Sequence, residues 1–157
     1  MAALEALGRE DGLGRRLFMI DVAAFEPLSP ALGISPTFAA FVVGDSTQAT
    51  AAALREFATS LITAGAVYVC AYGPGCTDLE TAVDEAGVRE EMRLGVERPV
   101  IMTTSHPSEP LSEAVEFFLR TAFPDEGYAD TCRSAVAITV GDAIPASDVK
   151  SAIEQLT

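Results

Sequence analysis

Residue types that carry out nucleophilic chemistry occur at turns that a fold could bring together. Cys76 ends the turn Gly73-Pro74-Gly75-Cys76 and precedes Thr77, a predicted helix N-cap. The partial positive charge at a helix N-terminus favours the thiolate, the reactive form of cysteine. If His106, the single histidine, lay within reach and Asp45 oriented it, the three would form a Cys–His–Asp nucleophilic arrangement. The simpler alternative is a semi-buried thiol in a tight turn, with a histidine that fixes its own loop.

A second set of residues could hold a ligand: Gly73, Gly75, Thr77, Thr104 and Asp142. Backbone amides at a turn that opens a helix can hold an anion. The chain contains neither a G-x-x-x-x-G-K-[ST] loop nor a G-x-G-x-x-G fingerprint, so we expect no nucleotide and no cofactor. Asp45 and Asp142 each follow a glycine and could hold a divalent cation, although Gly-Asp after a strand more often makes a turn. Tight Cys and His spacing is missing, so we expect no metal site of these ligands.

Short apolar runs alternate with helical patterns over most of the chain, which predicts parallel strands covered on both faces. The runs are Thr37–Val43, Val67–Tyr72, Pro99–Thr104 and Ala135–Val140. Thr77 and Glu80 match a capping box for a helix that we expect to bend near Gly87. We therefore predict a three-layer α/β fold with a mostly parallel sheet of about five strands and helices on both faces, Rossmann-like or flavodoxin-like. The candidate residues follow strands, so they should meet at one edge of the sheet.

The N-terminal part gives a weaker pattern. Leu17–Val22 is apolar and predicts a fifth strand. The loop from Pro27 to Pro36 is too short for an ordinary crossover helix, so we expect this strand to be an antiparallel edge. Residues 1–16 are expected to form a short helix or a flexible segment, within a single domain of residues 1–157.

Composition limits the partners. The chain has 157 residues, 49% of them hydrophobic, and a formal net charge of −13. Nucleic acid and anionic membrane surfaces attract basic residues, so both are excluded as partners. No stretch of about 18 apolar residues occurs, and three cysteines do not make a disulfide framework, so we expect a cytoplasmic protein. Cys132 precedes a strand and should lie at the opposite edge from Cys76.

An acidic and aromatic segment follows the third predicted helix and could meet a protein partner. Its residues are Phe117, Phe123, Asp125, Glu126 and Tyr128. Aromatic anchors dominate the binding energy of many interfaces. The alternative is that the phenylalanines cover the sheet or close the helix end.

Three runs resemble a small bacterial domain family of unknown function: VYVCAYGPGC, TTSHPSEPLSEAVEFFL and AFPDEGYADTC. The resemblance covers about the last 90 residues, bounded by the predicted strands. It implies that the Gly-Pro-x-Cys, Thr-Thr-x-His and Pro-Asp-Glu segments recur in the family. That family has no established activity, so the resemblance supports the fold and the place of the site and no mechanism.

The sequence thus favours a non-catalytic protein- or ligand-binding module of an accessory or immunity-like kind. One alternative is a thiol-dependent hydrolase that uses Cys76 and His106. Another is the binding of a small ligand or divalent cation at the edge where the strands end. Catalysis and oligomeric state stay open, with the balance against an enzyme because no complete catalytic set is present.

Overall fold

The computed structural model describes residues 3–29 and 34–157. Within them the strands form one sheet in the order β1-β2-β6-β3-β4-β5, and every neighbouring pair is parallel except β1 with β2. The strands are β1 (Glu5–Glu10), β2 (Arg16–Val22), β3 (Thr37–Val43), β4 (Ala66–Tyr72), β5 (Met102–His106) and β6 (Cys132–Val140). The helices are α1 (Ala51–Ala64), α2 (Cys76–Leu94), α3 (Leu111–Arg120) and α4 (Ala146–Leu156), with single 3-10 turns η1 (Ser46–Gln48) and η2 (Glu126–Tyr128).

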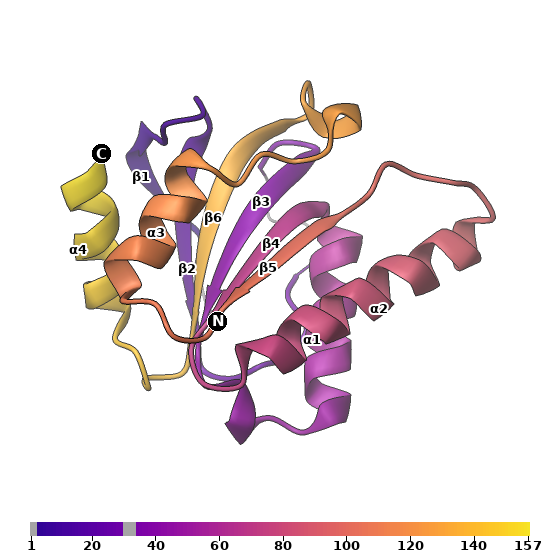
Figure 1. Cartoon of the computed structure of the whole chain (residues 1–157), viewed down its shortest axis with the longest axis horizontal. Coiled ribbons are helices and arrows are strands. Elements are labelled where there is room, and N and C mark those ends of the chain that lie inside the picture. Colours follow the sequence, from indigo (N-terminus) through magenta and orange to yellow (C-terminus); the bar gives the residue numbers. More distant parts are fainter. Residues whose placement is uncertain (1–2, 30–33) are drawn as a thin grey trace.

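Helices cover both faces of the sheet, which confirms the predicted three-layer α/β fold. In Figure 1, α1 and α2 lie on one side of the sheet, and α3 and α4 lie on the other. The strands β3, β4 and β6 are apolar along their length because their side chains alternate between the two layers, and both layers are buried. Phe57 lies in the core beneath α1, while Phe41 and Phe118 stack in the core beneath α3 with ring centroids 5.4 Å apart.

An antiparallel strand closes the N-terminal side of the sheet, as predicted, but it is β1 and not the strand predicted at Leu17–Val22. The strand β2 contains those residues and pairs in parallel with β6 along its whole length. Residues 1–16, predicted as a short helix or a flexible segment, instead contribute Glu5–Glu10 as a sixth strand. Most residues of β1 are exposed, so it lacks the apolar pattern by which buried strands are recognised.

The connection from β2 to β3 explains how β2 can run parallel to β6 and β3 without a crossover helix. Residues 30–33 of the predicted loop Pro27–Pro36 lie outside the described residues, and residues 23–29 and 34–36 contain no helix. The Phe25 ring packs edge-on against Phe57 of α1 with centroids 5.2 Å apart. The Leu28 amide donates a hydrogen bond to Ser60 Oγ at 3.0 Å. Side chains of the loop therefore provide the covering that a helix usually provides.

The helix α2 differs from its prediction at both ends. It begins at Cys76 with Gly75 as N-cap at φ +70°, so the capping box of Thr77 and Glu80 does not form. It continues through Gly87 to Leu94 without the expected bend. No helix in the described ranges has the length and apolarity needed to cross a membrane.

A buried ion pair ties the β1–β2 turn to the end of α3. Arg15 Nε donates to Asp11 Oδ2 at 2.7 Å, and both side chains are almost completely buried. The other guanidinium nitrogens donate to the backbone oxygens of Ala122, at 2.9 Å, and Phe118, at 2.8 Å. A cation is favourable here because the last carbonyl groups of a helix carry partial negative charge. The pair therefore fixes the position of the N-terminal hairpin on the α3 layer.

We expect Arg15→Met to lower the free energy of unfolding by about 3–5 kcal/mol, because it leaves the Asp11 carboxylate buried without its partner. The matched control is Arg120→Met, which breaks the exposed pair with Glu116 and should cost at most about 1 kcal/mol. Denaturant unfolding of both variants measures the difference. Equal losses in the two variants would contradict the role assigned to Arg15.

Candidate functional site

The parallel strands end at one edge of the sheet, and the residues predicted from the sequence lie on or after four of these ends. Asp45 follows β3, Gly73 follows β4, His106 ends β5 and Asp142 follows β6. Backbone hydrogen bonds hold neighbouring ends together, from the Gly44 amide to Tyr72 O at 3.1 Å, for example. The segments predicted to converge therefore do share one edge.

A pocket of about 420 Å³ opens at this edge between the ends of β2, β3 and β6. The strand β3 leads into α1 on one face, whereas its neighbour β6 leads into α4 on the other (Figure 1). Ligands of open α/β sheets bind where neighbouring strands diverge in this way. Phe25, Val140 and several alanines form the walls of the pocket. Asp45, Gln48, Thr50 and Asp142 supply its polar groups.

The structure brings Asp45 and Asp142 together at this switch-point pocket. The Asp45 carboxylate also caps η1, since its Oδ1 accepts a hydrogen bond from the Thr47 amide at 3.0 Å. Thr50 caps α1 by accepting from the Ala53 amide at 3.0 Å. No lysine or arginine is among the lining residues that the structure describes. Two carboxylates without a neighbouring cation give the pocket a negative potential, which attracts positively charged groups.

The Cys76 thiol and the His106 ring are not brought together. Cys76 is buried in the core beneath α1 and α2, beside the backbone of His106. Burial raises the pKa of the Cys76 thiol, and this outweighs the opposite effect of the neighbouring His106 backbone. The pKa of this thiol is therefore shifted in the direction opposite to the one expected at a helix N-terminus.

The His106 ring lies in the opposite layer, against α3. Its Nδ1 is 2.8 Å from Glu109 Oε1, and its Nε2 is 3.0 Å from Thr104 Oγ1. The ring centroid is 4.9 Å from that of Phe117. Both ring nitrogens are thus engaged by partners other than Cys76 and Asp45, and the histidine fixes the start of the loop before α3.

The glycines predicted to cradle an anion are required by backbone packing. Gly73 has φ +114°, and a Cβ there would lie 2.1 Å from the carbonyl oxygen of Gly44. Gly75 has φ +70° and faces Thr47 closely. The β4–α2 turn is therefore pressed against the segment after β3. Thr77 is exposed in the first turn of α2, and neither it nor the two glycines lines the switch-point pocket.

Most of the aromatic side chains of the predicted partner surface are packed inside the fold and are not exposed. Tyr128 is buried and donates a hydrogen bond to the Pro99 carbonyl at 2.9 Å. Phe117 packs between the rings of His106 and Tyr68. Phe123 is 63% exposed, and Asp125 and Glu126 lie near it in sequence, where Asp125 caps η2. One exposed aromatic side chain among three does not form the surface that the sequence suggested.

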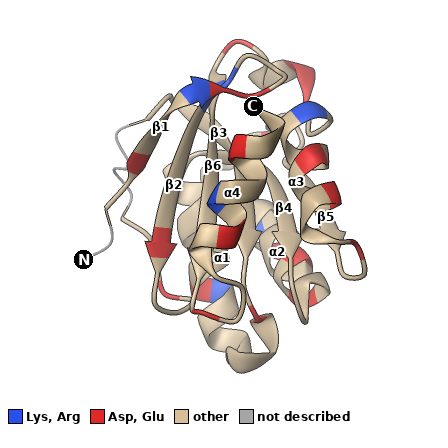
Figure 2. Ribbon diagram, turned by 90° about the vertical axis from the view of Figure 1, so that its left-hand side faces the viewer, with Lys and Arg blue, Asp and Glu red and all other residues tan. Residues whose placement is uncertain are grey.

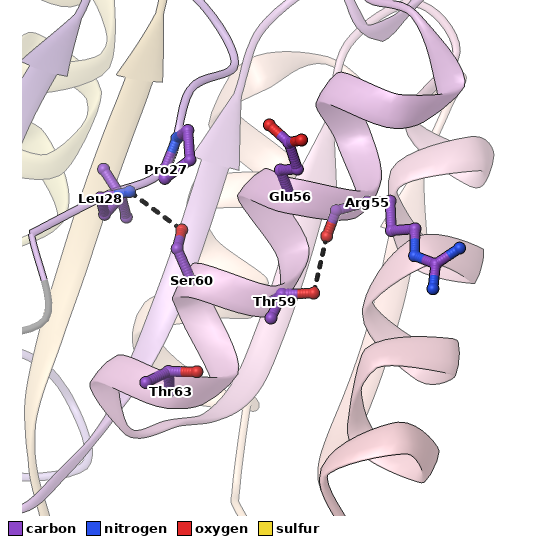
Figure 3. Close-up of a pocket in the computed structure, with 7 residues that line it drawn as sticks. All are labelled: Pro27, Leu28, Arg55, Glu56, Thr59, Ser60 and Thr63. Atoms are coloured by element: carbon purple, nitrogen blue, oxygen red, sulfur yellow. Dashed lines mark hydrogen bonds between the residues drawn. The ribbon is translucent and has the colours of Figure 1, made fainter.

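A second depression of about 410 Å³ lies along α1, against the segment after β2 (Figure 3). Its hydroxyl groups are bonded locally. Ser60 Oγ donates to Phe57 O at 2.6 Å, and Thr59 Oγ1 donates to Arg55 O at 2.9 Å. Because it lies on the flank of a helix and away from the strand ends, we place the candidate site at the switch-point pocket.

Metal ligands are not gathered anywhere in the described ranges: no group of three or more His, Cys, Asp or Glu side chains is placed to share an ion. The cysteines are all buried and unpaired. Cys132 begins β6, at the opposite edge from Cys76, as predicted. Asp45 and Asp142 are the residues that could contact a cation carried by a ligand.

Sequence reasoning missed the contribution of the segment after β2. Ala23, Ala24 and Phe25 line the pocket because β2 is parallel to β6, whereas an antiparallel β2 would end at the other edge. The available signal was the apolar run of Leu17–Val22, which is typical of a parallel strand buried on both faces.

A parallel sheet covered on both faces, with a pocket at its switch point, defines a doubly wound α/β domain. The chain belongs to the family described as a domain of unknown function, DUF7684, whose model matches residues 18–155. This confirms the predicted membership of an uncharacterised domain family. Neither a curated protein nor a solved structure matches the chain.

We expect the thiols of the folded protein to react slowly at neutral pH. Burial raises the pKa of Cys76, and it raises that of Cys70 to about 12, so little thiolate is present. Mass spectrometry after treatment with iodoacetamide should find Cys76 modified at least about 10-fold more slowly than free cysteine. The unfolded protein, as control, should react fully. Rapid and selective modification of Cys76 would contradict this environment.

Proposed function

We propose that this domain is a non-catalytic binding module that holds a small molecule in the switch-point pocket. The observation that carries the proposal is the convergence of Asp45 and Asp142 on one pocket of about 420 Å³ at the divergence of β3 and β6. Pockets for small ligands usually combine apolar walls with a few placed polar groups and have volumes of about 300–1,000 Å³. The position, size and lining of this pocket all agree with that description.

The lining favours a ligand with an apolar body and a positively charged group. Phe25, Val140 and the alanines provide apolar contact. The carboxylates of Asp45 and Asp142 would form charge-assisted hydrogen bonds with an ammonium group. A free phosphate would be repelled by the same carboxylates unless a divalent cation came with it.

The thiol-dependent hydrolase is the weaker candidate. A nucleophilic cysteine needs a base within reach and a lowered pKa. The His106 ring is bonded to Glu109 and Thr104, and burial raises the pKa of Cys76. These contacts favour structural roles for both residues, so we assign no catalytic step to them.

We also propose a cytoplasmic location. Cys70, Cys76 and Cys132 are all buried as free thiols. Disulfides are rare in reducing compartments and common in oxidising ones. Three unpaired cysteines in a domain of this size support a reducing compartment such as the cytoplasm.

The ligand chemistry can be tested with two probes of similar shape and opposite charge, phenethylammonium and phenylacetate. We expect phenethylammonium to shift backbone amide resonances around the pocket in NMR titrations, and phenylacetate to shift none of them. Asp142→Asn should weaken phenethylammonium binding at least about 10-fold, since a hydrogen bond to a charged group contributes about 1.5–3 kcal/mol. Ala143→Phe, which fills the pocket from an exposed position, should abolish binding and leave the fold unchanged.

The matched control is Asp130→Asn, which removes an exposed carboxylate away from the pocket and should leave binding unchanged. Equal binding of the two probes, or shifts that map outside the pocket, would refute the proposed chemistry. A response that needs magnesium and inorganic phosphate together would instead identify a cation-bridged anion as the ligand, and the ammonium proposal would fail.

A further inference from the structure

The two edges of the sheet differ in how they are protected. The edge strand β1 carries Glu5, Arg9 and Glu10, has an irregular register with β2, and turns through Gly8 at φ +72°. Charges, irregular pairing and short length are the features by which proteins prevent edge strands from pairing with other chains. The β1 edge therefore has the usual protection.

The edge strand β5, with five residues, is also short, but it has neither charged residues nor irregular pairing. Its sequence, Met-Thr-Thr-Ser-His, contains no Lys, Arg, Asp or Glu, no glycine and no proline. Its register with β4 is regular from Met102 to His106, and in the sheet of the described residues β4 is its only neighbour. One row of backbone N–H and C=O groups along β5 is thus available to another strand.

Exposed apolar side chains gather beside this edge. Within residues 3–29 and 34–157, seven large hydrophobic residues are exposed, and all except Phe123 lie between residues 88 and 102. They form what we call the α2/β5 surface: Val88, Met92, Leu94, Val96, Val100 and Met102. Met92 is 77% exposed, and Val88 and Val100 line a common groove of about 210 Å³. Grouped exposure of this kind marks interaction sites.

The same stretch is electrically balanced. Residues 88–102 hold three arginines and three glutamates, which leaves seven basic and 20 acidic residues for the rest of the chain. Figure 2 marks acidic residues along the ribbons of α3 and α4. A second copy of this chain, itself strongly acidic, would be repelled over most of the molecule and less at residues 88–102. The carboxylates nearest to β5, Asp84 and Glu80, accept hydrogen bonds from Thr103 and Ser105. A basic partner would instead be drawn to the acidic parts.

We propose that the α2/β5 surface is a homodimer interface in which the β5 strands of two copies pair antiparallel about a two-fold axis. Such pairing is self-complementary, because each β5 offers the other the same row of donors and acceptors. Because α2 runs antiparallel to β5, the apolar C-terminal end of each α2 would then face the N-terminal part of the other copy's α2 beside the joined strands. A standard interface buries about 800 Å² per partner. That is roughly a tenth of the 7711 Å² surface of the chain. The switch-point pocket, at the ends of β2, β3 and β6, is separate from this interface, so this inference does not rest on the proposed function.

Light scattering coupled to size-exclusion chromatography tests the interface. We expect a particle of twice the chain mass of 16.4 kDa. Its dissociation constant should be below about 100 µM. Met92→Glu and Val100→Glu, both at exposed positions, should each weaken dimerisation at least about 10-fold. Ala52→Glu, an exposed site on α1, adds the same charge as a control and should not change it. Thermal unfolding of each variant verifies that it is folded.

Hydrogen exchange of the unmodified chain tests the strand pairing independently of any variant. Backbone amides of residues 102–106 should exchange more slowly as the protein concentration rises through the dissociation constant. A monomer at all concentrations up to about 1 mM would overturn the inference. So would a dimer that survives both glutamate substitutions, or one that leaves the exchange of residues 102–106 unchanged.

Discussion

The arrangement of this domain depends on the insertion of its last strand between two of its first. The strand β6 hydrogen-bonds to β2 along one side and to β3 along the other, residue by residue. Nearly all of its side chains are buried, alternately in the two layers. Because β6 and β3 lead into helices on opposite faces, their separation creates the switch-point pocket. The candidate site therefore depends on the pairing of β6, from the C-terminal part of the chain, with β2 and β3 from the N-terminal part.

The strands that could be predicted are those whose burial on both faces makes them continuous runs of apolar residues. The runs Thr37–Val43, Val67–Tyr72 and Ala135–Val140 are apolar because both faces are covered, and all three are strands. Glu5–Glu10 could not be found in the same way, since a solvated edge strand has no apolar pattern and is formed by pairing alone. The start of α2 was misplaced because a glycine at positive φ, which offers no side-chain signal, took the place of the expected cap.

The site was predictable in position and not in chemistry. Asp45 and Asp142 follow neighbouring parallel strands, so their meeting follows from topology. The predicted contact between Cys76 and His106 does not form because side chains alternate between the two faces of a strand, and this alternation decides on which face of the sheet the His106 ring lies. The predicted strand ends at Thr104, whereas β5 continues to His106. With the true end, Thr104 and His106 share a face directed at α3, and the thiol lies beneath the other face.

The central position of β6 also affects the chain during synthesis. Residues 132–140 leave the ribosome after β2, β3, β4 and β5, and the domain is made at about 5–20 residues per second. Through that interval β2 and β3 cannot complete the sheet between them, and each presents an unpaired inner edge beside apolar side chains. The gap between β2 and β3 has the width of one strand, and the β6 segment of another copy would pair with both strands in the same register. Exchange of β6 between neighbouring nascent chains is therefore the misassembly that this topology allows.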